Sequence, residues 1–274
     1  MAFIWLCSYP KSGNTWLRIL LTLYLSGKHS KRFSFANLIG PSTHLGCHLF
    51  DEIMGINSSD LTPGELDHYR CLFHKHFIHR FNSTTFTKTH ESYLSPFTDK
   101  PMFPQHTRCK VIYLIRNPLD IATSYANHIS CSIDTIIDHM NNSQALVRHG
   151  DASFDEHLNS WSSHVNEWSK QKDIPLLLVR YEDLLLDPHL ALSRILQFSG
   201  FSIDPGIMQH AIDHSTFDKL QSLEQMFGFN EHSSSTSNFF RRGRSGEGKN
   251  ELTKYQTQKI LSLHDKTMRR FGYS

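Results

Sequence analysis

The sequence has almost no net charge. Its 274 residues include 28 Lys and Arg against 26 Asp and Glu, which gives a formal charge of +2. Proteins that coat nucleic acids neutralise phosphates with a strong basic excess. This balance therefore argues against a nucleic acid partner of that kind, although a local basic pocket stays compatible with it.

Long hydrophobic runs and cysteine pairs are also missing. The longest apolar stretch, residues 16–25, is about ten residues long and contains Arg18, whereas a membrane-spanning helix needs about 20 residues. The first residues lack the basic flank of a secretory signal. Five cysteines without a C-x-x-C pair favour reduced thiols over a disulfide framework. We therefore expect a cytoplasmic protein without membrane insertion.

What the chain does contain is typical of a folded domain. A hydrophobic content of 39% and an aromatic content of 12% indicate a packed core rather than disorder. The length suits one α/β domain over residues 1–274. Protonation of all 19 histidines would raise the formal charge to about +21, so the behaviour of the protein below about pH 6 should differ sharply.

Three segments share the order of apolar run, turn and helix. The apolar runs are residues 3–9, 111–115 and 175–179, and the helices are expected at 15–25, at 119–129 and after 180–183. Residues 83–88 are a fourth strand candidate. Continuous apolar strands that alternate with helices indicate an α/β fold with a parallel sheet buried on both faces.

Further signals mark helix starts and loops. Thr62 with Glu65, and Ser153 with Glu156, have the spacing of capping boxes, and Pro188 after Asp187 opens another helix. The remaining segments are a long His-bearing excursion at 28–82, a predicted mobile flap at 228–249 and a helix-period stretch at 252–271.

Residues 9–16 form the first candidate site. They read Y-P-K-S-G-N-T-W at the turn between a predicted strand and helix, where backbone N–H groups converge on an anion. The order differs from G-x-x-x-x-G-K-[ST], because Lys11 precedes Gly13. Taken alone, the segment could also be an ordinary Pro/Gly turn.

Two more segments carry positive charge where it could bind an anion. Arg116 ends a predicted strand, and Ser124 follows about two helical turns later, so both could hold a second anion. The alternative is an ion pair between Arg116 and Asp120. Residues 239–250 have a net charge of +3 on a Gly-rich backbone, which by itself is also typical of a solvated surface.

Together the three segments resemble those of the sulfotransferase family that uses 3′-phosphoadenosine 5′-phosphosulfate (PAPS). The similar family segments are the 5′-phosphosulfate loop (9–16), the 3′-phosphate motif (116–124), a helix after a core strand (181–188), the adenine-flanking turn (215–217) and the C-terminal R-K-G-x-x-G-x-x-K-N segment (241–250). The loop with Asn14 is also similar to that of bacterial glycopeptide sulfotransferases. The resemblance implies a P-loop-like three-layer α/β fold, with a central parallel sheet flanked by helices.

The resemblance also implies a set of cofactor-binding residues. PAPS would be the co-substrate and 3′-phosphoadenosine 5′-phosphate (PAP) the product. Implied contacts of the 5′-phosphosulfate and the adenine face are Lys11, Ser12, Gly13, Asn14, Thr15 and Trp16. Implied contacts of the 3′-phosphate are Arg116, Ser124, Arg241, Arg242 and Gly243, and those of the adenine are Tyr181, Ser215 and Phe217. Flat rings can stack on the base, and Arg suits a phosphate because its planar fork makes paired hydrogen bonds.

The implied catalytic residues complete the set. The segment F-T-K-T-H, residues 86–90, resembles the K-T-H segment of the family, which makes His90 the general base that accepts the proton of the acceptor hydroxyl. Lys11 and Lys88 would stabilise the charge that develops on the leaving phosphate and the transferring oxygens. No metal is expected in this scheme.

Some residues depart from the family pattern. Glu247 and Gly248 stand where cytosolic animal members usually have Asp-Trp, and Arg242 replaces a Lys. Lys254 and Gln258 replace two residues of the family's dimer motif, so the oligomeric state stays open.

Other readings stay open as well. The Cys and His residues of 44–79, above all Cys71, His74 and His79, could bind zinc, although their spacing is irregular. A kinase that uses Mg-ATP and a non-catalytic module that binds a nucleotide or RNA are the alternative functions. The expected acceptor is a small molecule with a hydroxyl group, and the expected pocket walls are residues 28–82, 130–152 and 225–248.

Overall fold

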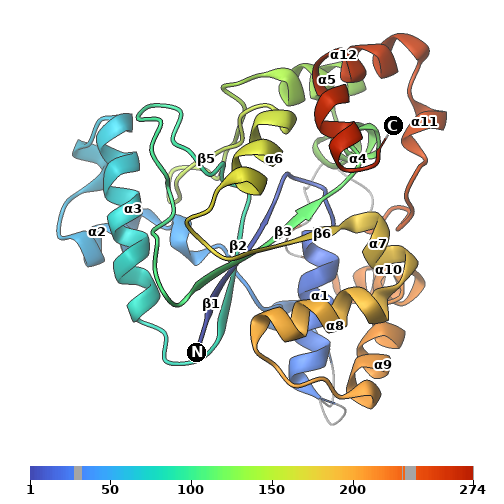
Figure 1. The fold of residues 1–274 in the computed structure, drawn as a ribbon, viewed down its shortest axis with the longest axis horizontal. Coiled ribbons are helices and arrows are strands. Elements are labelled where there is room, and N and C mark those ends of the chain that lie inside the picture. Colours follow the sequence, from blue (N-terminus) through green and yellow to red (C-terminus); the bar gives the residue numbers. More distant parts are fainter. Residues whose placement is uncertain (28–32, 230, 232–238, 274) are drawn as a thin grey trace. The chain divides into compact units, whose positions relative to one another are not determined.

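The computed structural model describes residues 1–27, 33–229, 231 and 239–273 (Figure 1). Its central sheet has four strands in the order β2-β1-β3-β6. The strands are β1 (Phe3–Ser8), β2 (Thr85–Thr89), β3 (Cys109–Ile115) and β6 (Leu176–Arg180). The sheet is parallel and flanked by helices, which confirms the predicted α/β class.

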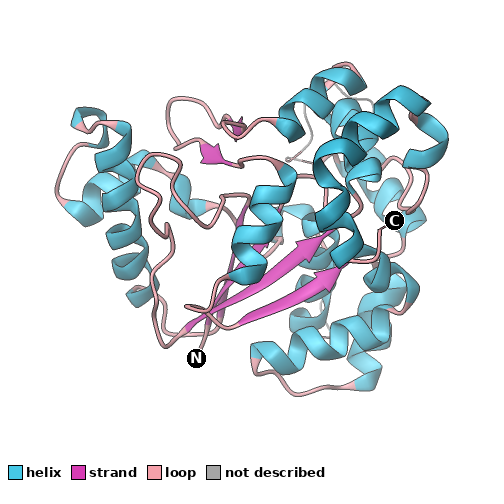
Figure 2. Ribbon diagram, turned by 45° about the horizontal axis from the view of Figure 1, so that its top comes forward, coloured by secondary structure: helices cyan, strands magenta, loops and turns pink. Residues whose placement is uncertain are grey.

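Helices and loops make up most of the described chain (Figure 2). The α-helices are α1 (Asn14–Ser26), α2 (Cys47–Met54), α3 (Pro63–His79), α4 (Pro118–Ile129), α5 (Ile133–Asn141), α6 (Trp161–Lys170), α7 (Tyr181–Leu186), α8 (Pro188–Ser199), α9 (Pro205–His214), α10 (Phe217–Phe227), α11 (Gly248–Glu251) and α12 (Lys254–Arg270). Short 3-10 turns cover Phe35–Asn37, Thr43–Leu45 and Ser58–Asp60, and β4 (Leu146–Val147) pairs antiparallel with β5 (Glu156–His157).

The chain folds into two compact units that alternate along the sequence. The first unit contains Met1–Tyr9, Gly40–Tyr113 and His139–Leu178. The second unit contains Pro10–Ile39, Leu114–Asp138 and Val179–Ser274. The single domain expected over residues 1–274 stays a prediction.

The strands begin and end close to where their apolar runs predict. All six side chains of β1 are buried, and so are all those of β3 except Lys110. A strand that is apolar at consecutive positions is stable only where both faces of the sheet are covered. None of the helices in the described part of the chain combines the length and the apolar composition needed to cross a bilayer.

Two of the three predicted helix starts are confirmed. The Thr62 hydroxyl accepts the N–H of Glu65, whose carboxylate accepts the N–H of Thr62, and α3 begins at Pro63. The Asp187 carboxylate accepts the N–H of Leu190 at the start of α8. These caps fix the direction in which each helix leaves its loop.

The capping box predicted at Ser153 and Glu156 is wrong. Ser153 forms an isolated bridge with Gly46, and Glu156 lies in strand β5. Helix α6 begins later, at Trp161, with the Ser160 hydroxyl as its cap. The buried Glu156 carboxylate has long-range partners that a local capping pattern cannot reveal.

The two long predicted loops are only partly described. Residues 28–32 of the 28–82 excursion, and 230 and 232–238 of the predicted flap at 228–249, lie outside the described residues. The described part of the excursion contains α2 and α3, as the helical reading expected. The flap segment ends in α11, and α12 then covers most of the predicted helix at 252–271.

Candidate functional site

The loop after β1 leads into the N-terminus of α1, in the second unit. Two of its residues have a positive φ, Lys11 at 65° and Gly13 at 97°. A Cβ atom on Gly13 would lie 2.4 Å from Cδ2 of Tyr181, so this turn requires glycine. The amides of Asn14 and Thr15 open the helix, and such N–H groups attract anions.

Two buried donors at this place fit an anion as well. In the part of the chain that the structure describes, Ser12 Oγ and Arg116 Nε have no hydrogen-bond partner. Buried polar atoms without a partner are rare in proteins and usually have a functional reason. A phosphate or sulfate oxygen would satisfy donors of this type.

Aromatic residues adjoin the loop within the same unit. Trp16 Nε1 donates to the backbone oxygen of Ser215 at 3.0 Å. The rings of Trp16 and Tyr181 meet edge to face with centroids 6.0 Å apart. The Arg116 guanidinium lies 4.5 Å from the Tyr181 ring centroid, and burial raises the pKa of Tyr181 although Arg116 opposes that shift. Flat surfaces and cationic donors therefore share one small region.

Arg116 connects the loop to the C-terminal segment. Its Nη1 donates to the Lys11 oxygen at 2.9 Å and its Nη2 to the Arg244 oxygen at 3.1 Å. Asp120, considered above as an ion-pair partner of Arg116, uses both carboxylate oxygens to accept backbone N–H groups, those of Gly246 and Gly248. Ser124 is half-buried further along α4.

The C-terminal segment contacts α10. Gly243 has φ 59°, and a Cβ atom on it would lie 2.3 Å from Cδ2 of Phe217. The two arginines of the segment are ion-paired: Arg241 with Glu251 at 3.4 Å, and Arg242 with Glu247 at 2.9 Å and also with Glu251. All the predicted cofactor-binding residues thus lie in the second unit, which contains residues 10–16 of the loop and both of the other predicted anion segments.

Sequence reasoning missed two carboxylates of this unit and the ring contact of Lys11. The Glu231 carboxylate accepts from Thr15 Oγ1 at 3.3 Å and pairs with Arg18 at 2.5 Å. The Lys11 ammonium lies 4.2 Å from the ring centroid of Phe239. The Glu224 carboxylate accepts the N–H groups of Phe239 and Phe240. Their partners are distant in sequence, so no local motif marks these residues.

His90 and Lys88 lie in the first unit, at the end of β2. Cys7 pairs with Thr89 in the parallel register of β1 and β2, which places His90 beside Ser8. The Nδ1 atom of His90 is 2.7 Å from the Ser8 backbone oxygen. A carbonyl oxygen only accepts, so Nδ1 carries the proton and Nε2 is the ring nitrogen that can take up another. Lys88 is half-buried in β2, two residues before His90.

The backbone of His90 is held from both sides. Its N–H donates to Glu156 Oε1 at 2.5 Å, and its carbonyl accepts from Nε2 of His164 at 3.0 Å. The Tyr113 hydroxyl donates to Nδ1 of His164 at 2.7 Å. Burial lowers the pKa of His164 to about 4, so this imidazole is neutral near pH 7. A neutral ring can accept at Nδ1 and donate from Nε2 at the same time. Sequence reasoning missed these supporting residues.

Glu156 is a buried anion at the centre of this network. Burial alone would raise its pKa, but hydrogen bonds and nearby imidazoles outweigh burial and hold the pKa well below its ordinary value. Its second oxygen accepts from His149 Nε2 at 3.0 Å, and Thr89 Oγ1 donates to its first oxygen at 2.8 Å. The neighbouring Glu91 behaves differently: burial raises its pKa to about 7 although Arg70 pairs with it at 2.6 Å.

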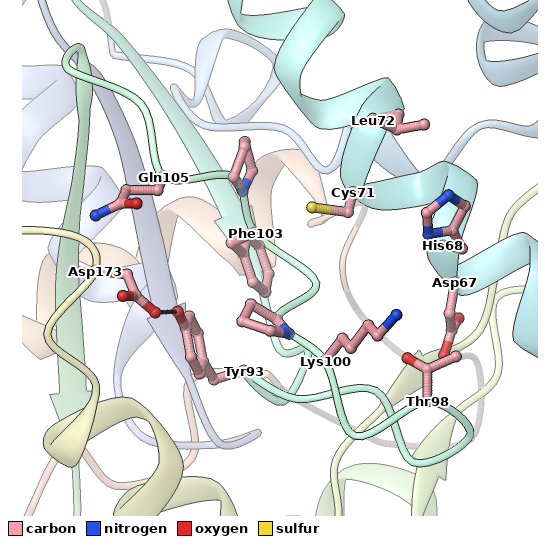
Figure 3. Close-up of a pocket in the computed structure, with 12 residues that line it drawn as sticks. Asp67, His68, Cys71, Leu72, Tyr93, Thr98, Lys100, Phe103, Gln105 and Asp173 are labelled. Atoms are coloured by element: carbon pink, nitrogen blue, oxygen red, sulfur yellow. Dashed lines mark hydrogen bonds between the residues drawn. The ribbon is translucent and has the colours of Figure 1, made fainter.

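The first unit also contains a pocket of about 360 Å³ (Figure 3). Its lining residues include Asp67, Cys71, Lys100 and Phe103, and the Tyr93 hydroxyl donates to Asp173 at its edge. Only the lining residues of α3 fall within the acceptor walls expected from the sequence, and the lining includes none of the predicted catalytic residues.

The zinc alternative finds no support. Across residues 1–27, 33–229, 231 and 239–273, no group of three or more His, Cys, Asp or Glu side chains is arranged to hold a metal ion. The buried His74 stacks on Phe103, with ring centroids 5.4 Å apart, and its Nδ1 lies 2.9 Å from the Met102 oxygen. This histidine is therefore part of the core.

Relatives match this chain over nearly its whole length. Flavonol 3-sulfotransferase of Flaveria bidentis is 26% identical over 97% of this chain and 81% of its own. Sulfotransferase 1B1 of Mus musculus is 26% identical over 95% of this chain and 81% of its own.

Solved structures share the fold. Mouse sulfotransferase SULT7A1 complexed with PAP has a TM-score of 0.61 at 20% identity, covering 98% of this chain and 85% of that one. Retinol dehydratase in complex with androsterone and inactive cofactor PAP has a TM-score of 0.63 at 18% identity, covering 97% and 80%.

The match to a protein family is nearly complete. The family described as Sulfotransferase domain matches residues 3–272. The resemblance to PAPS-dependent sulfotransferases is thereby confirmed, and the chain belongs to the sulfotransferase family.

Proposed function

We propose that this enzyme transfers the sulfuryl group of PAPS to a hydroxyl of a small-molecule acceptor in the cytoplasm, and releases PAP. The observation that carries the proposal lies in the second unit: Arg116 donates to the Lys11 oxygen of the loop and to the Arg244 oxygen of the C-terminal segment, and its guanidinium lies over the Tyr181 ring, which meets Trp16. Two separate sets of anion donors beside aromatic rings suit a nucleotide with two phosphorylated positions. The names of the relatives, which include a flavonol sulfotransferase, support a small hydroxylated acceptor.

The proposed binding roles follow from the donors. Ser12 Oγ and the amides at the start of α1 would hold the 5′-phosphosulfate, with Lys11 beside them. Arg116, Ser124, Arg241, Arg242 and the backbone of Gly243 would hold the 3′-phosphate. Thr15 would add a hydroxyl donor. Trp16, Tyr181, Ser215 and Phe217 would surround the adenine, because their positions adjoin the anion loop.

The proposed chemistry needs one proton acceptor. PAPS supplies an activated sulfuryl group. The acceptor oxygen forms a bond to sulfur while the bond between sulfur and the phosphate oxygen breaks, and the hydroxyl proton moves to Nε2 of His90. The hydrogen bond to Ser8 fixes the tautomer required for this step. Lys11 and Lys88 would stabilise the charge on the leaving phosphate and the transferring oxygens.

A thermal-shift experiment tests the nucleotide. PAP at about 100 times its Kd should stabilise the protein by about 2.7 kcal/mol, a rise in Tm of several degrees. Mg-ATP and single-stranded RNA at equal concentration are the comparison arms. A shift with Mg-ATP or RNA but none with PAP would contradict the proposal.

Two variants test the proposed roles separately. His90→Ala should abolish sulfuryl transfer while PAP still binds, and the exposed His48→Ala is the matched control. Arg116→Ala should weaken PAP more than adenosine 5′-phosphosulfate, which lacks the 3′-phosphate. Full activity of the His90 variant would remove this residue from the base role. A screen of hydroxylated acceptors that monitors PAP release then identifies the acceptor.

A further inference from the structure

Asp120 makes an unusual pair of contacts in the second unit. It lies in the first turn of α4 and is 3% exposed. Its Oδ2 accepts the N–H of Gly246 and its Oδ1 accepts the N–H of Gly248, both at 2.7 Å. One buried carboxylate thus holds two backbone amides that are more than 120 residues away in sequence. We call this arrangement the glycine clasp.

The clasp continues the segment that contains the predicted 3′-phosphate ligands. Arg241, Arg242 and Gly243 come directly before it, and the Arg244 carbonyl accepts from Arg116. Hydrogen bonds from both α4 and the residue at the end of β3 therefore hold residues 244–248. The arginines of the segment can keep a fixed position only if the backbone that follows them is fixed.

The packing leaves little room for another arrangement. A Cβ atom on Gly248 would lie 2.4 Å from the Leu119 carbonyl oxygen and 2.8 Å from the Asp120 amide nitrogen. Gly246 has φ 81°, a conformation that other residues adopt at a cost. Gly248 therefore allows the close approach to α4, and Gly246 allows the left-handed turn, that the clasp requires.

We propose that Asp120 is a positioning residue for 3′-phosphate recognition, which it supports through the glycine clasp by fixing Arg241 and Arg242. The inference rests on the function proposed above. Only a carboxylate can serve both amides, because asparagine offers one acceptor oxygen and an NH₂ group that would oppose the second N–H. The Gly248 N–H is buried, and a buried N–H that loses its partner costs free energy, so the segment would move away from α4.

The test compares two nucleotides that differ in the 3′-phosphate. PAP and adenosine 5′-monophosphate (AMP) are titrated by calorimetry into the wild type and Asp120→Asn. We expect the variant to bind PAP about tenfold more weakly or worse and AMP unchanged, so that the preference for PAP falls. Gly248→Ala perturbs the clasp from the loop side and should reduce the same preference. Asp134→Asn, an exposed aspartate in the first turn of α5, is the matched control and should change neither affinity.

Hydrogen–deuterium exchange of the ligand-free protein gives a second readout. Asp120→Asn should accelerate exchange of the Gly246 and Gly248 amides and leave α4 protected. Unchanged exchange would refute the clasp. If Asp120→Asn lost affinity for PAP and AMP equally, or kept the preference of the wild type for PAP, the positioning role would be refuted. A wild type that does not prefer PAP over AMP would refute the proposed function and with it the nucleotide role of Asp120, and the exchange rates would still decide the clasp.

Discussion

Lowering the pH from 7 to 5 should destabilise the fold through buried histidines. Burial lowers the pKa of His44 to about 3 and the pKa values of His164 and His264 to about 4. The unfolded chain, with histidine pKa values near 6.5, takes up these protons first, so stability is lost as the pH falls below about 6.5. Each of the three histidines lowers the free energy of unfolding by about 2 kcal/mol between pH 7 and pH 5. Together they lower it by about 5 to 6 kcal/mol.

Glu91 acts in the opposite direction. Its pKa of about 7 lies above that of an unfolded glutamic acid, so the folded state takes up this proton first, and stability rises by about 2 kcal/mol between pH 7 and pH 5. Glu156, whose pKa is depressed, loses its contribution only below about pH 4.5. The three histidines and Glu91 together therefore lose about 3 to 4 kcal/mol of stability at pH 5, and the buried His74, whose pKa burial also lowers, adds to this loss.

Urea unfolding at the two pH values measures this difference, with the fluorescence of the buried Trp5, Trp161 and Trp168 as the probe. His264→Leu removes one contribution and should reduce the loss between pH 7 and pH 5 by about 2 kcal/mol. The same substitution at the exposed His48 should leave the loss as in the wild type. A free energy of unfolding that stays constant or rises at pH 5 would refute the reasoning.

Two further predictions concern the first unit. Ser160→Ala should lower the free energy of unfolding in urea by about 1 kcal/mol because α6 loses its cap. Ser153→Ala should change this free energy by less than about 0.5 kcal/mol. Equal effects of the two substitutions would contradict the assigned start of α6. Glu156→Gln should lower kcat about tenfold and leave the affinity for PAP unchanged, because the neutral amide holds the backbone of His90 less firmly. Steady-state kinetics measures kcat, and calorimetry measures the affinity for PAP. An unchanged kcat would contradict the role of Glu156 in holding His90.

Local sequence patterns predicted most of the fold that positions the site. The runs at 3–9 and 111–115 are apolar at nearly every position, which only a sheet covered on both faces explains. Pro and Gly at the turn after residue 9, and Thr62 before Pro63, mark element ends through backbone chemistry alone. Such signals act within a few residues, and β1, β3, α1 and α3 accordingly begin close to the expected positions.

The contacts that organise the site were beyond such patterns. Glu156 has the spacing of a capping residue, but its partners are the His90 amide and Thr89, 66 and 67 residues away. Asp120 has an obvious partner in Arg116, yet two glycine amides hold it. A buried carboxylate binds whichever donors the tertiary fold supplies, and backbone N–H groups carry no sequence signal.

The close approach of Gly248 to Leu119 has a consequence for exchanging parts between relatives. Cytosolic animal members with a similar segment usually have Trp where this chain has Gly248, and here even a Cβ atom would lie 2.4 Å from a backbone oxygen of α4. A C-terminal segment taken from such a member would therefore not pack against α4 of this chain. Residues 116–124 and 241–250 therefore have to match each other. A chimera should exchange both segments together or leave both in place.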